Sequence, residues 1–561
     1  MKLAKHKKPT KQRRVSAAGA AVLSVSAVTA AGGVMADARD QGQGQDNKDS
    51  GKVGRYVSGD FHNHTTCSDG SLSVQKLVDK STGAFDLDWF IQAGHGGNSA
   101  RNCTLAEDPF EPVKPALGLT VPPTYPSSGQ PAADGKGPNQ TWVATLPNGE
   151  AGIKGDVVLQ SGVRSMWKWQ EIQEFIYPVT ERESRNRGKP IFVGLEQNVP
   201  GHEHSSTAIV DGQLPKQGNG NANDVAQYEY CFDRSDNDRS RGATNQWDCA
   251  VPGGTNNGLL DPAARKIIVA GGTGSGVAGH AKTLEGIKWL SAISPDGSYF
   301  VPAHLERAGA FNPNGNSGYN VEHLRDFNNS DPEIAFGFES MPGHQAEASR
   351  GSYSRNAVGG GTYGGTGVYA AAVGGVWDAL LGEGRRWYFF ASSDYHNRGS
   401  FGPDQRETTA DFFPGEYTRD YVAVNRDGND SKNSNDDRNR KGANYGPQEI
   451  VDGLRSGDSF VANGGLIDKL AFVACSVPRG GQHSGEDAIA ASAAAGEAFR
   501  QGDCATMGET LTVKRNNDVI VTAVVRDPEA RASRPTLSRI PRSSRSASRS
   551  RSTHRCSITS I

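Results

Sequence analysis

The sequence predicts a mixed α/β fold in which a (β/α) barrel is followed by a small β-domain. The first observation is an alternation of apolar strands with helices of regular apolar spacing, clearest over residues 282–396. The second is that these strands end in histidine or acidic residues, at the end where (β/α) barrels carry their functional side chains. The third is length, because 561 residues are enough for two or three domains with a sizeable core.

Residues 1–38 are expected to be a signal peptide. Residues 1–14 carry seven Lys and Arg and no acidic residue, and an Ala/Gly/Val/Ser run covers residues 15–34. Ala36-Asp37-Ala38 then matches the A-x-A pattern of a cleavage site. A membrane anchor is the alternative, because the run is about long enough to span a bilayer. Its many small residues favour export followed by cleavage.

The mature protein is therefore expected to be periplasmic or secreted and to have no membrane anchor. The arginine pair at residues 13–14 is compatible with the twin-arginine export route. Residues 39–54 are polar and are expected to be a linker.

The net charge of −2 conceals an acidic body, because basic residues concentrate at the two ends of the chain. Residues 531–561 contain eight Arg and no acidic residue. An acidic body argues against a general nucleic-acid-binding groove, so no nucleic-acid partner is expected. The Arg/Ser tail has no apolar period and is expected to be disordered. A slip of the reading frame that truncates the β-domain would also explain this composition.

The cysteine pattern fits an oxidising compartment. The first six of the seven cysteines fall into sequence-local pairs, and Cys556 remains in the tail. Six cysteines allow many connectivities, so local pairing is a hypothesis. A zinc site is the competing interpretation, but no C-x-x-C occurs, and disulfides in an exported protein are favoured. The expected pairs are Cys67/Cys103, Cys231/Cys249 and Cys475/Cys504.

The barrel is expected over residues 55–465, with two large insertions at about residues 98–165 and 211–276. A helix at residues 73–81 with Ser71 or Ser73 as its cap is predicted first. The insertions are rich in Gly and Asn, and GGTGSG at their end lacks the context of a phosphate-binding loop, which favours a flexible connector. Further helices are predicted at residues 166–188 (kinked or ended by Pro178), 282–293, 321–327, 368–381 and 448–455.

Strands are predicted between these helices, and several carry a polar residue of ligand type at or after their end. Residues 86–93 lead into His95, residues 191–199 contain Glu196, and residues 299–306 contain His304. Residues 334–340 contain Glu339, and residues 387–396 end in Asp394 and His396. A last barrel strand is predicted at residues 458–464, and residues 466–530 alternate like the strands of a small β-domain.

The stretch DFHNHTTCSDG at residues 60–70 carries the strongest chemical signal. Alternate side chains of a strand share a face, so Asp60, His62 and His64 are expected to project together. Two imidazoles from one strand end make half of a metal site, and the second pair, Asp394 and His396, strengthens that hypothesis. Asp60 is expected to support a ligating histidine rather than bind metal itself.

The order of these residues along the chain resembles the metal-binding pattern of the PHP (polymerase and histidinol phosphatase) superfamily. That pattern runs His-x-His and Ser-Asp-Gly, then a histidine, Gly-x-Glu, two further histidines and a final Asp-x-His. The resemblance covers about residues 55–465 and implies a distorted seven-stranded, TIM-like (β/α) barrel with two or three divalent metals (Zn, Mn or Fe). This chain departs from the pattern where Ala93-Gly94, and not an aspartate, precede His95.

The resemblance also implies the grouping of the ligands. His62, His64, Glu196 and Asp394 would hold one metal, and Glu196 would bridge to a second. Between His202 and His204, the family spacing favours His204. The second metal would be held with His204 and His304, and a third by Asp69, His95 and His396. Outside this set, Glu339 has no assigned role, and His280, His323, His344 and His483 are expected to be structural or solvated.

The activity that the resemblance implies is hydrolysis of a phosphate ester, with a small-molecule or phosphoester substrate. A carboxylate can bridge two cations, and such cations lower the pKa of a bound water molecule. The guanidinium group of arginine can bind a phosphate through two parallel hydrogen bonds. The residues expected to take part in catalysis are Glu196, His204, His396, Arg307 and Arg398. Two alternatives remain. One is an amidohydrolase-like enzyme acting on non-phosphate esters or carbamates, and the other is a non-catalytic, exported metal-binding protein.

Overall fold

The structure is a computed structural model. The residues it describes are 55–108, 111–115, 141–210, 224–243, 247–252, 260–267, 276–307, 318–342, 362–363, 366–396, 412–424, 445–479, 484–495 and 504–526. The predicted signal peptide and linker, the tail at 531–561, His344, His483 and Arg398 lie outside these ranges.

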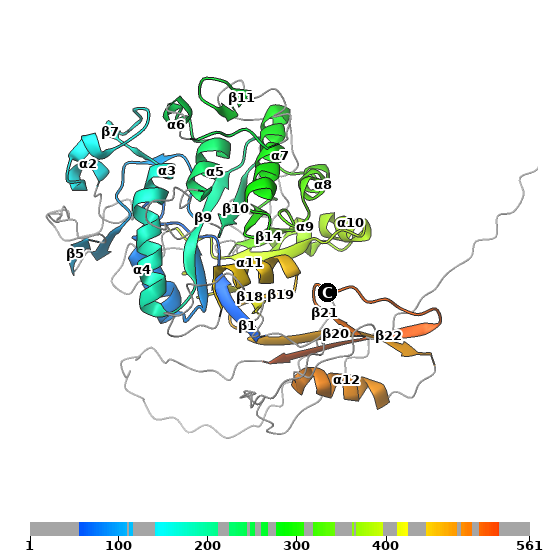
Figure 1. Cartoon of the computed structure of the whole chain (residues 1–561). Helices are drawn as coiled ribbons and strands as arrows, with labels where there is room; N and C mark the ends of the chain where they lie inside the picture. The colour runs from blue at the N-terminus through cyan, green and yellow to red at the C-terminus, as the bar shows by residue number, and fades with distance from the viewer. Residues whose placement is uncertain are drawn as a thin grey trace, which may run out of the picture.

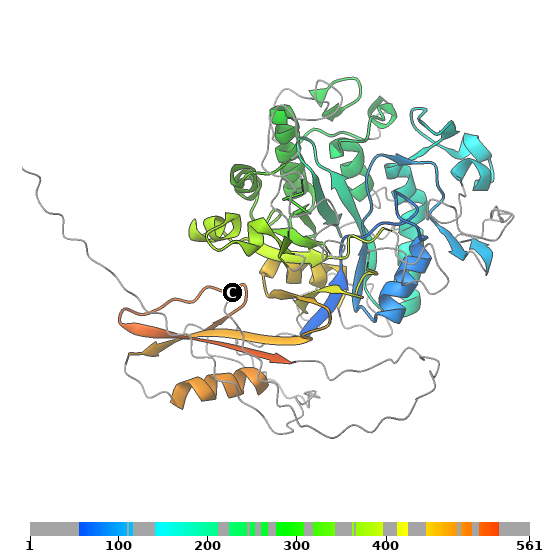
Figure 2. The same ribbon diagram turned by 180° about the vertical axis from the view of Figure 1, so that it is seen from behind.

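One nearly closed sheet of nine strands, in the order β17-β14-β13-β10-β9-β2-β1-β18-β19, forms the centre of the larger unit (Figure 1). Its helices lie around the outside of this sheet, as the view from behind also shows (Figure 2). The strands are β1 (Arg55–Asp60), β2 (Trp89–Gln92), β9 (Ile191–Asn198), β10 (His204–Ile209), β13 (Ser298–Ala303), β14 (Gly337–Pro342), β17 (Tyr388–Ser392), β18 (Thr418–Val424) and β19 (Ser459–Asn463).

Seven of these strands, all except β10 and β18, run in the same direction, so their carboxyl ends meet at the same end of the barrel. β2 pairs parallel with β1 and β9, and β14 pairs parallel with β13 and β17. β10 runs antiparallel between β9 and β13 and thereby keeps those two in the same direction. The segment after β17 then bonds to the segment after β1, because Asp394 N–H donates to His62 O at 3.0 Å and His64 N–H to Tyr395 O at 2.8 Å.

β10 and β18 are the two barrel strands that the sequence did not predict. Both are antiparallel to their neighbours, and simple strand–helix alternation predicts only parallel strands. β10 begins with the polar residues His204, Ser205 and Ser206, which lack the apolar run of a typical buried strand. The mixed α/β fold with a nearly closed, barrel-like sheet is confirmed, but this sheet has more strands than the alternation suggested.

The predicted helices are present, with shifted ends and one break. Ser73 caps α1 by accepting from Lys76 N–H, as expected of a serine at this position. The predicted helix at 368–381 is divided into two. The helices on the barrel are α1 (Val74–Asp79), α4 (Tyr177–Arg187), α7 (Gly276–Ile293), α8 (Val321–Ser330), α9 (Val368–Ala371), α10 (Val376–Gly382) and α11 (Pro447–Ser456). A π-helical segment (Lys80–Ala84) continues α1.

Pro178 does not end its helix. α3 (Lys168–Glu171) continues through a π-turn (Ile172–Ile176) into α4, where Pro178 occupies the first turn. Because the helix is continuous here, Pro178 removes one intrahelical hydrogen bond, and the preceding π-helical segment, after which Tyr177 N–H donates to Ile172 O, accommodates the proline. Gly188 closes α4 with a left-handed φ of 63°.

The described parts of the two insertions contain ordered structure. In the second insertion, α5 (Asp224–Phe232) packs Tyr228, Tyr230 and Phe232 into the main apolar core, while residues 271–275 of the predicted connector GGTGSG lie outside the described residues. The remaining short elements are β3 (Asn98–Ser99), β4 (Leu105–Asp108), β5 (Glu111–Pro115), α2 (Trp142–Thr145), a 3-10 turn (Gly149–Gly152), β6 (Leu159–Gln160), β7 (Val163–Arg164), β8 (Met166–Trp167), α6 (Ser240–Ala243), β11 (Leu260–Asp261), β12 (Lys266–Ile267), β15 (Thr362–Tyr363) and β16 (Thr366–Gly367).

A layer of aromatic rings lies directly under the ends of the parallel strands. Phe61, between Asp60 and His62, meets Tyr299 and Phe390 edge-to-face at centroid distances of 6.1 and 5.9 Å. These rings belong to a fully buried apolar cluster drawn from the barrel strands and α11. The histidines that follow β1 therefore rest on a rigid apolar floor.

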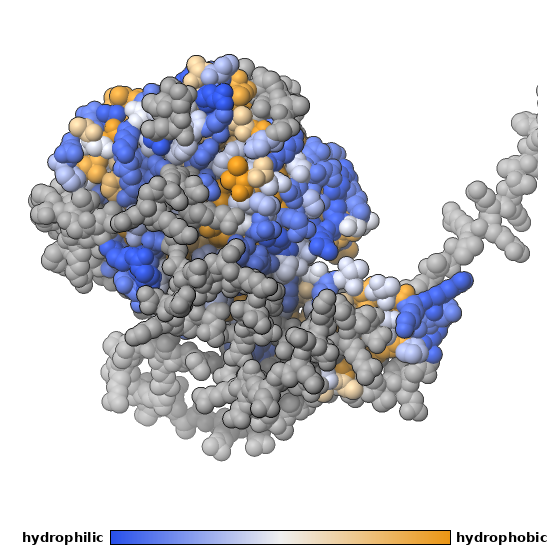
Figure 3. Space-filling model, in the orientation of Figure 1, coloured by the Kyte–Doolittle hydropathy of each residue, from blue (hydrophilic) through white to orange (hydrophobic). Residues whose placement is uncertain are grey.

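A small C-terminal unit follows the barrel (Figures 1 and 2). β20 (Lys469–Pro478) pairs antiparallel with β21 (Cys504–Thr506) and β22 (Asn517–Arg526), and α12 (Ser484–Ala495) accompanies them. The expected β-strands are thus present, together with a helix that the sequence did not predict. Val519, Val521 and Val525 of β22 are exposed, and Figure 3 shows hydrophobic atoms on this unit beside strongly hydrophilic ones.

All three predicted disulfides are present, namely Cys67–Cys103, Cys231–Cys249 and Cys475–Cys504. The first two lie in the barrel unit and the third joins β20 to β21. Their number is typical of proteins from oxidising compartments. Among the described residues, the helices are too short or too polar to cross a membrane.

Candidate metal centre

The residues singled out at the strand ends converge on one site. β1 delivers His62 and His64, the turn after β2 delivers His95, and β9 carries Glu196. His204 opens β10, and His304 follows β13. Asp394 and His396 follow β17, and Asp69 lies in the loop after His64. All nine predicted metal ligands are therefore brought to the carboxyl end of the parallel strands.

Glu196 is the centre of this group. Its side chain is 1% exposed, and ring nitrogens of five histidines lie within 3.1 Å of its two carboxylate oxygens. Oε1 lies 3.1 Å from His62 Nε2, 2.7 Å from His204 Nδ1 and 3.0 Å from His304 Nε2, and Oε2 lies 3.1 Å from His64 Nε2 and 2.7 Å from His95 Nδ1. One carboxylate that faces imidazoles through both oxygens has the form of a bridging ligand.

Asp394 completes a buried group of four possible ligands. Its Oδ1 lies 3.2 Å from His62 Nε2 and 3.1 Å from His64 Nε2, and these three side chains and Glu196 are almost fully buried. Asp394 and His304 both have positive φ, 43° and 35°. Asp and His are among the residues that tolerate this conformation best, at a cost of about 1–3 kcal/mol. The fold thus holds two candidate ligands in strained conformations that aim them into the site.

A second group lies nearer the solvent. Asp69 Oδ2 lies 3.6 Å from His95 Nε2 and 3.5 Å from His396 Nε2, and the three side chains are 45%, 23% and 27% exposed. His64 joins them, because its Nδ1 lies 3.1 Å from Asp69 Oδ1 and its ring stacks on His396 at 3.9 Å. The site therefore has a buried floor and a partly exposed rim.

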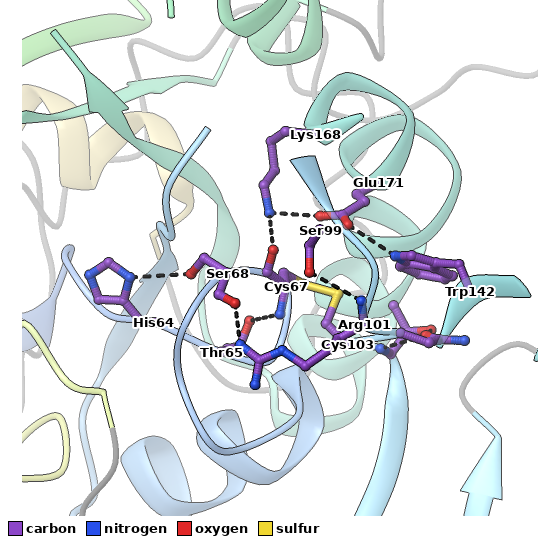
Figure 4. The surroundings of a disulfide bond; sticks show 12 residues. His64, Thr65, Cys67, Ser68, Ser99, Arg101, Cys103, Trp142, Lys168 and Glu171 are labelled. Carbon is purple, nitrogen blue, oxygen red and sulfur yellow. Dashed lines mark hydrogen bonds and ion pairs between the residues drawn. A yellow bond between two sulfur atoms is a disulfide. The ribbon is translucent and has the colours of Figure 1, made fainter. Parts of the chain in front are cut away.

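The loop that presents Asp69 is fixed from several sides (Figure 4). Cys67 is joined to Cys103, and its carbonyl accepts from Lys168 Nζ at 2.7 Å. Arg101 donates to the carbonyls of Ser68 and Gly70. A Cβ at Gly70 would lie 2.4 Å from the backbone carbon of His64, so only glycine fits this close return of the loop. The disulfide, these hydrogen bonds and the close return at Gly70 together fix the position of Asp69 in the Ser-Asp-Gly motif.

Charge compensation links the carboxylates and imidazoles. Burial alone would lower the pKa of His62, but the carboxylates of Glu339 and Glu196 outweigh it and raise that pKa well above its ordinary value. Burial opposes the charged form of His95 too, yet Glu196 is the main cause that raises its pKa to about 9. Burial and the nearby Arg307 lower the pKa of His304 to about 3. Without a cation, some imidazoles carry the positive charge that the buried carboxylates require.

The donor set fits divalent metal ions. His62 Nε2, His95 Nδ1 and Glu196 Oε2 are buried and make no hydrogen bond to another described residue, although oppositely charged groups lie close. Buried polar atoms are normally hydrogen-bonded, so atoms of this kind that face one another suit a shared cation. Imidazole nitrogen with carboxylate oxygen is the ligand set of Zn²⁺, Mn²⁺ and Fe²⁺ in proteins.

Two positional predictions are resolved by the geometry. His204, and not His202, lies against Glu196, while His202 belongs to a separate group of histidines. Asp60 does not face a histidine, because its carboxylate accepts from Ser393 N–H at 2.6 Å and from Asn63 Nδ2 at 2.9 Å. The strand β1 ends at Asp60, so strict alternation of side chains does not extend to His62 and His64.

Arg307 lies at the rim. Its guanidinium donates to Glu203 at 2.7 Å and lies 3.4 Å from His204 Nδ1, and its side chain is 24% exposed. Glu203 thereby fixes a positive charge beside the site, where an anionic substrate can meet it.

Glu339 is a further candidate functional residue, which lies outside the set of residues that match the PHP pattern. This carboxylate on β14 is fully buried, and its Oε2 lies 2.9 Å from His62 Nδ1. A carboxylate accepts a hydrogen bond, so it fixes the proton on Nδ1 and directs Nε2 of His62 toward Glu196 and Asp394. Its place at a strand end was visible in the sequence, and that position is the signal that could have included it.

Comparison of the chain with protein-family models, with curated protein sequences and with solved structures found no match.

Proposed function

We propose that this protein is a metal-dependent hydrolase of phosphate esters, built on a PHP-type distorted (β/α) barrel. The observation that carries the proposal is Glu196, a buried carboxylate with histidine nitrogens at 2.7–3.1 Å on both oxygens. A single structural metal ion needs only about four ligands. A carboxylate with histidine nitrogens on both oxygens can bridge two adjacent cations, and such a pair of cations is typical of hydrolytic sites.

The residues divide between the floor and the rim. His62, His64, Glu196 and Asp394 would hold one cation, and His204 and His304 would share Glu196 with a second. Asp69, His95 and His396 at the rim would hold a third. Divalent cations in such a site lower the pKa of water and neutralise negative charge on a substrate.

The protein's own groups would orient the substrate and hold protons. Arg307, fixed by Glu203 at 2.7 Å, would bind a phosphate oxygen at the rim. Glu339 keeps the proton of His62 on Nδ1, so that Nε2 faces the site. His204 and His396, both partly exposed, would act at the substrate side through the cations that they hold. Arg398, the other predicted phosphate ligand, follows His396 closely in sequence.

The three disulfides support an exported location, and the basic, small-residue N-terminus supports a cleaved signal peptide. Sequencing of the N-terminus of the exported protein should begin near residue 39. Retention of residues 15–34 in a membrane fraction would contradict cleavage.

The test of the function is Glu196→Gln in the mature protein. The amide keeps size and shape but removes the negative charge that offsets two cations, so both should be lost and turnover abolished. Asp394→Asn should lose less metal, because the nearest ring nitrogens to its carboxylate are those of His62 and His64, and it does not bridge the two groups as Glu196 does. Metal content and turnover on a panel of phosphate monoesters and diesters are the measurements.

Glu333→Gln is the matched control, because Glu333 is 55% exposed and far from the site. It should retain metal and activity. A fully active Glu196→Gln protein would remove the basis of the proposal. A wild-type protein that binds metal and cleaves only carboxylic esters or carbamates would keep the metal site and refute the phosphoesterase assignment. Metal binding without any hydrolysis would favour a non-catalytic protein.

A further inference from the structure

A second group of histidines lies outside the Glu196 centre. His202 is in the turn between β9 and β10, His280 is on α7, and His323 is on α8. His202 Nε2 lies 2.8 Å from His280 Nδ1. The ring centroid of His323 lies 4.5 Å from that of His202 and 4.8 Å from that of His280. Each of the three rings offers a nitrogen within 4.8 Å of the others.

The outer hydrogen bonds of two rings determine where their protons sit. His202 Nδ1 lies 3.0 Å from the carbonyl of Gly318, which can only accept, so Nδ1 carries a proton. His280 Nε2 lies 3.2 Å from Asp326 Oδ2, and the carboxylate likewise requires a proton on Nε2. In the neutral rings, His202 Nε2 and His280 Nδ1 therefore face each other at 2.8 Å with two lone pairs. Such a pair requires a positive group between the nitrogens.

A shared proton or a metal cation can supply that positive group. A shared proton can join only two of the rings, whereas a cation can bind all three. The outer partners of His202 and His280 match those of metal-binding histidines, which donate their other N–H to a carbonyl or a carboxylate. His202 is fully buried, with Tyr319 stacked on it at 4.7 Å and Phe327 edge-on at 5.7 Å.

We propose that His202, His280 and His323 bind a divalent cation that prefers imidazole, in the first place Zn²⁺, at a site separate from the Glu196 centre. Nitrogen-only donors favour Zn²⁺, Cu²⁺ or Ni²⁺ over Mg²⁺ and Ca²⁺, which take oxygen. Tetrahedral zinc with bonds of 2.0–2.1 Å separates its nitrogens by ~3.3 Å. His202 and His280 need to move apart only slightly to admit the ion.

Binding of the cation by His323 would break one hydrogen bond of that side chain. Its Nδ1 accepts from Asn320 N–H at 3.0 Å in the capping box of α8. A cation on Nδ1 would occupy the lone pair that accepts this hydrogen bond. A cation on Nε2 would move the ring proton to Nδ1, which could then no longer accept. The backbone N–H groups of His323 and Leu324 still donate to the carbonyl of Asn320, so α8 keeps its first turn.

The site would fasten the β9–β10 turn to two helices. His202 and His280 are 78 residues apart in sequence, and the turn between the two strands also carries Glu203, with His204 opening β10. Tyr319, stacked on His202, donates its hydroxyl to the carbonyl of His204 at 2.8 Å. A cation in this position would therefore hold the backbone from which His204 reaches Glu196.

The test is a titration of the metal-free, full-length mature protein with Zn²⁺ and with Co²⁺ as a spectroscopic probe. Wild type should bind one cation more than His280→Gln and one more than His323→Gln, while both variants keep the ions that depend on Glu196. In the Glu196→Gln background the cation at the three histidines should remain, and adding His280→Gln should remove it. Asp326→Asn should weaken this ion about 10–100-fold without changing the stoichiometry.

Equal stoichiometry and affinity in wild type and His280→Gln would overturn the proposal, as would binding only at millimolar Zn²⁺. His280 is 12% exposed and Gln keeps a polar side chain that can still bond to Asp326, so the replacement should leave the fold intact. Thermal unfolding is the second measurement. Zn²⁺ should raise the Tm of Glu196→Gln by more than that of Glu196→Gln/His280→Gln, in which only the rim group of Asp69, His95 and His396 is left to bind it. These results do not depend on hydrolysis, so failure of the proposed activity would be seen separately.

Discussion

Oε2 of Glu339 lies 2.9 Å from Nδ1 of His62, and both side chains are fully buried. The contact connects β14 to the end of β1 across the barrel, and it leaves Nε2 of His62 pointing toward Glu196 and Asp394. Histidines that bind metal commonly donate their other N–H in this way, which fixes the tautomer and the orientation of the ring.

Glu339→Gln tests this relationship. The amide keeps the shape but removes the charge that raises the pKa of His62, so metal binding at the floor of the site should weaken about 10–100-fold. The protein should remain folded, because Gln can still accept from His62. Competition of a chelator with bound metal gives the affinity. An unchanged affinity would show that Glu339 has no part in the metal centre.

The strand-end residues of the site could be predicted from the sequence, and their mutual distances could not. Glu196, His304 and Asp394 end or follow an apolar run, which is a local property of the chain, whereas Asp69 and His204 stand in polar stretches and belong to the set through the family resemblance. Glu339 has the same local property, but it lies outside the pattern of residues on which the resemblance rests. Only the closed sheet shows that β14 brings it to His62.

The group of His202, His280 and His323 shows a different limit of the sequence. Each residue alone is an isolated histidine on a helix or in a turn, and isolated histidines carry little information. Their approach depends on α7 packing beside α8 and on the antiparallel strand β10, which the sequence did not predict. Long-range packing, rather than local pattern, creates this group.

The Cys67–Cys103 disulfide should stabilise the loop that carries Asp69. It closes a loop with a sequence separation of 36, for which chain entropy gives about 3–4 kcal/mol. Cys67→Ser/Cys103→Ser should lose about this much in the free energy of unfolding and should also bind the rim metal more weakly. Denaturant unfolding and metal titration are the measurements, with Cys475→Ser/Cys504→Ser as the control.

The control disulfide lies in the C-terminal unit, away from the metal centre. Its loss should reduce stability there without affecting metal affinity. Equal metal loss in the two double variants would contradict a specific role of Cys67–Cys103 in placing Asp69.

Lys168 and Glu171 form a buried ion pair behind the same loop (Figure 4). Lys168 Nζ donates to Glu171 Oε2 and to Cys67 O at 2.7 Å each, and Trp142 Nε1 donates to Glu171 Oε1 at 3.0 Å. Glu171→Gln leaves a buried ammonium without its counter-charge, which should cost about 3–5 kcal/mol of stability. Chemical denaturation followed by circular dichroism would measure this loss.

The exposed pair of Arg386 and Glu333, 3.9 Å apart, is the comparison. Glu333→Gln should change stability by less than about 1 kcal/mol, because the pair is solvated. Similar effects of Glu171→Gln and Glu333→Gln would mean that the buried pair contributes no more than a surface contact.

Asp458 should make the stability of the protein depend on pH, whether or not a metal is bound. It follows α11, accepts a hydrogen bond from Tyr56 of β1, and has its pKa raised to about 6, mainly by burial. The unfolded carboxyl ionises near pH 3.9, so between about pH 4 and 6 the native state binds more protons than the unfolded state. This group therefore makes the protein less stable as the pH rises through that window, and its full cost is present above about pH 6.

Asp458→Asn removes the ionisation while its amide oxygen can still accept from Tyr56. The variant should match wild type below about pH 4 and become more stable above about pH 6, by at most about 3 kcal/mol. Tyr56→Phe removes a hydrogen bond that favours the ionised carboxylate, so it should move the midpoint of the pH effect upward. Unfolding free energies measured from pH 3.5 to 7.5 test both. A constant difference between wild type and Asp458→Asn over this range would show that Asp458 titrates alike in the folded and unfolded chain.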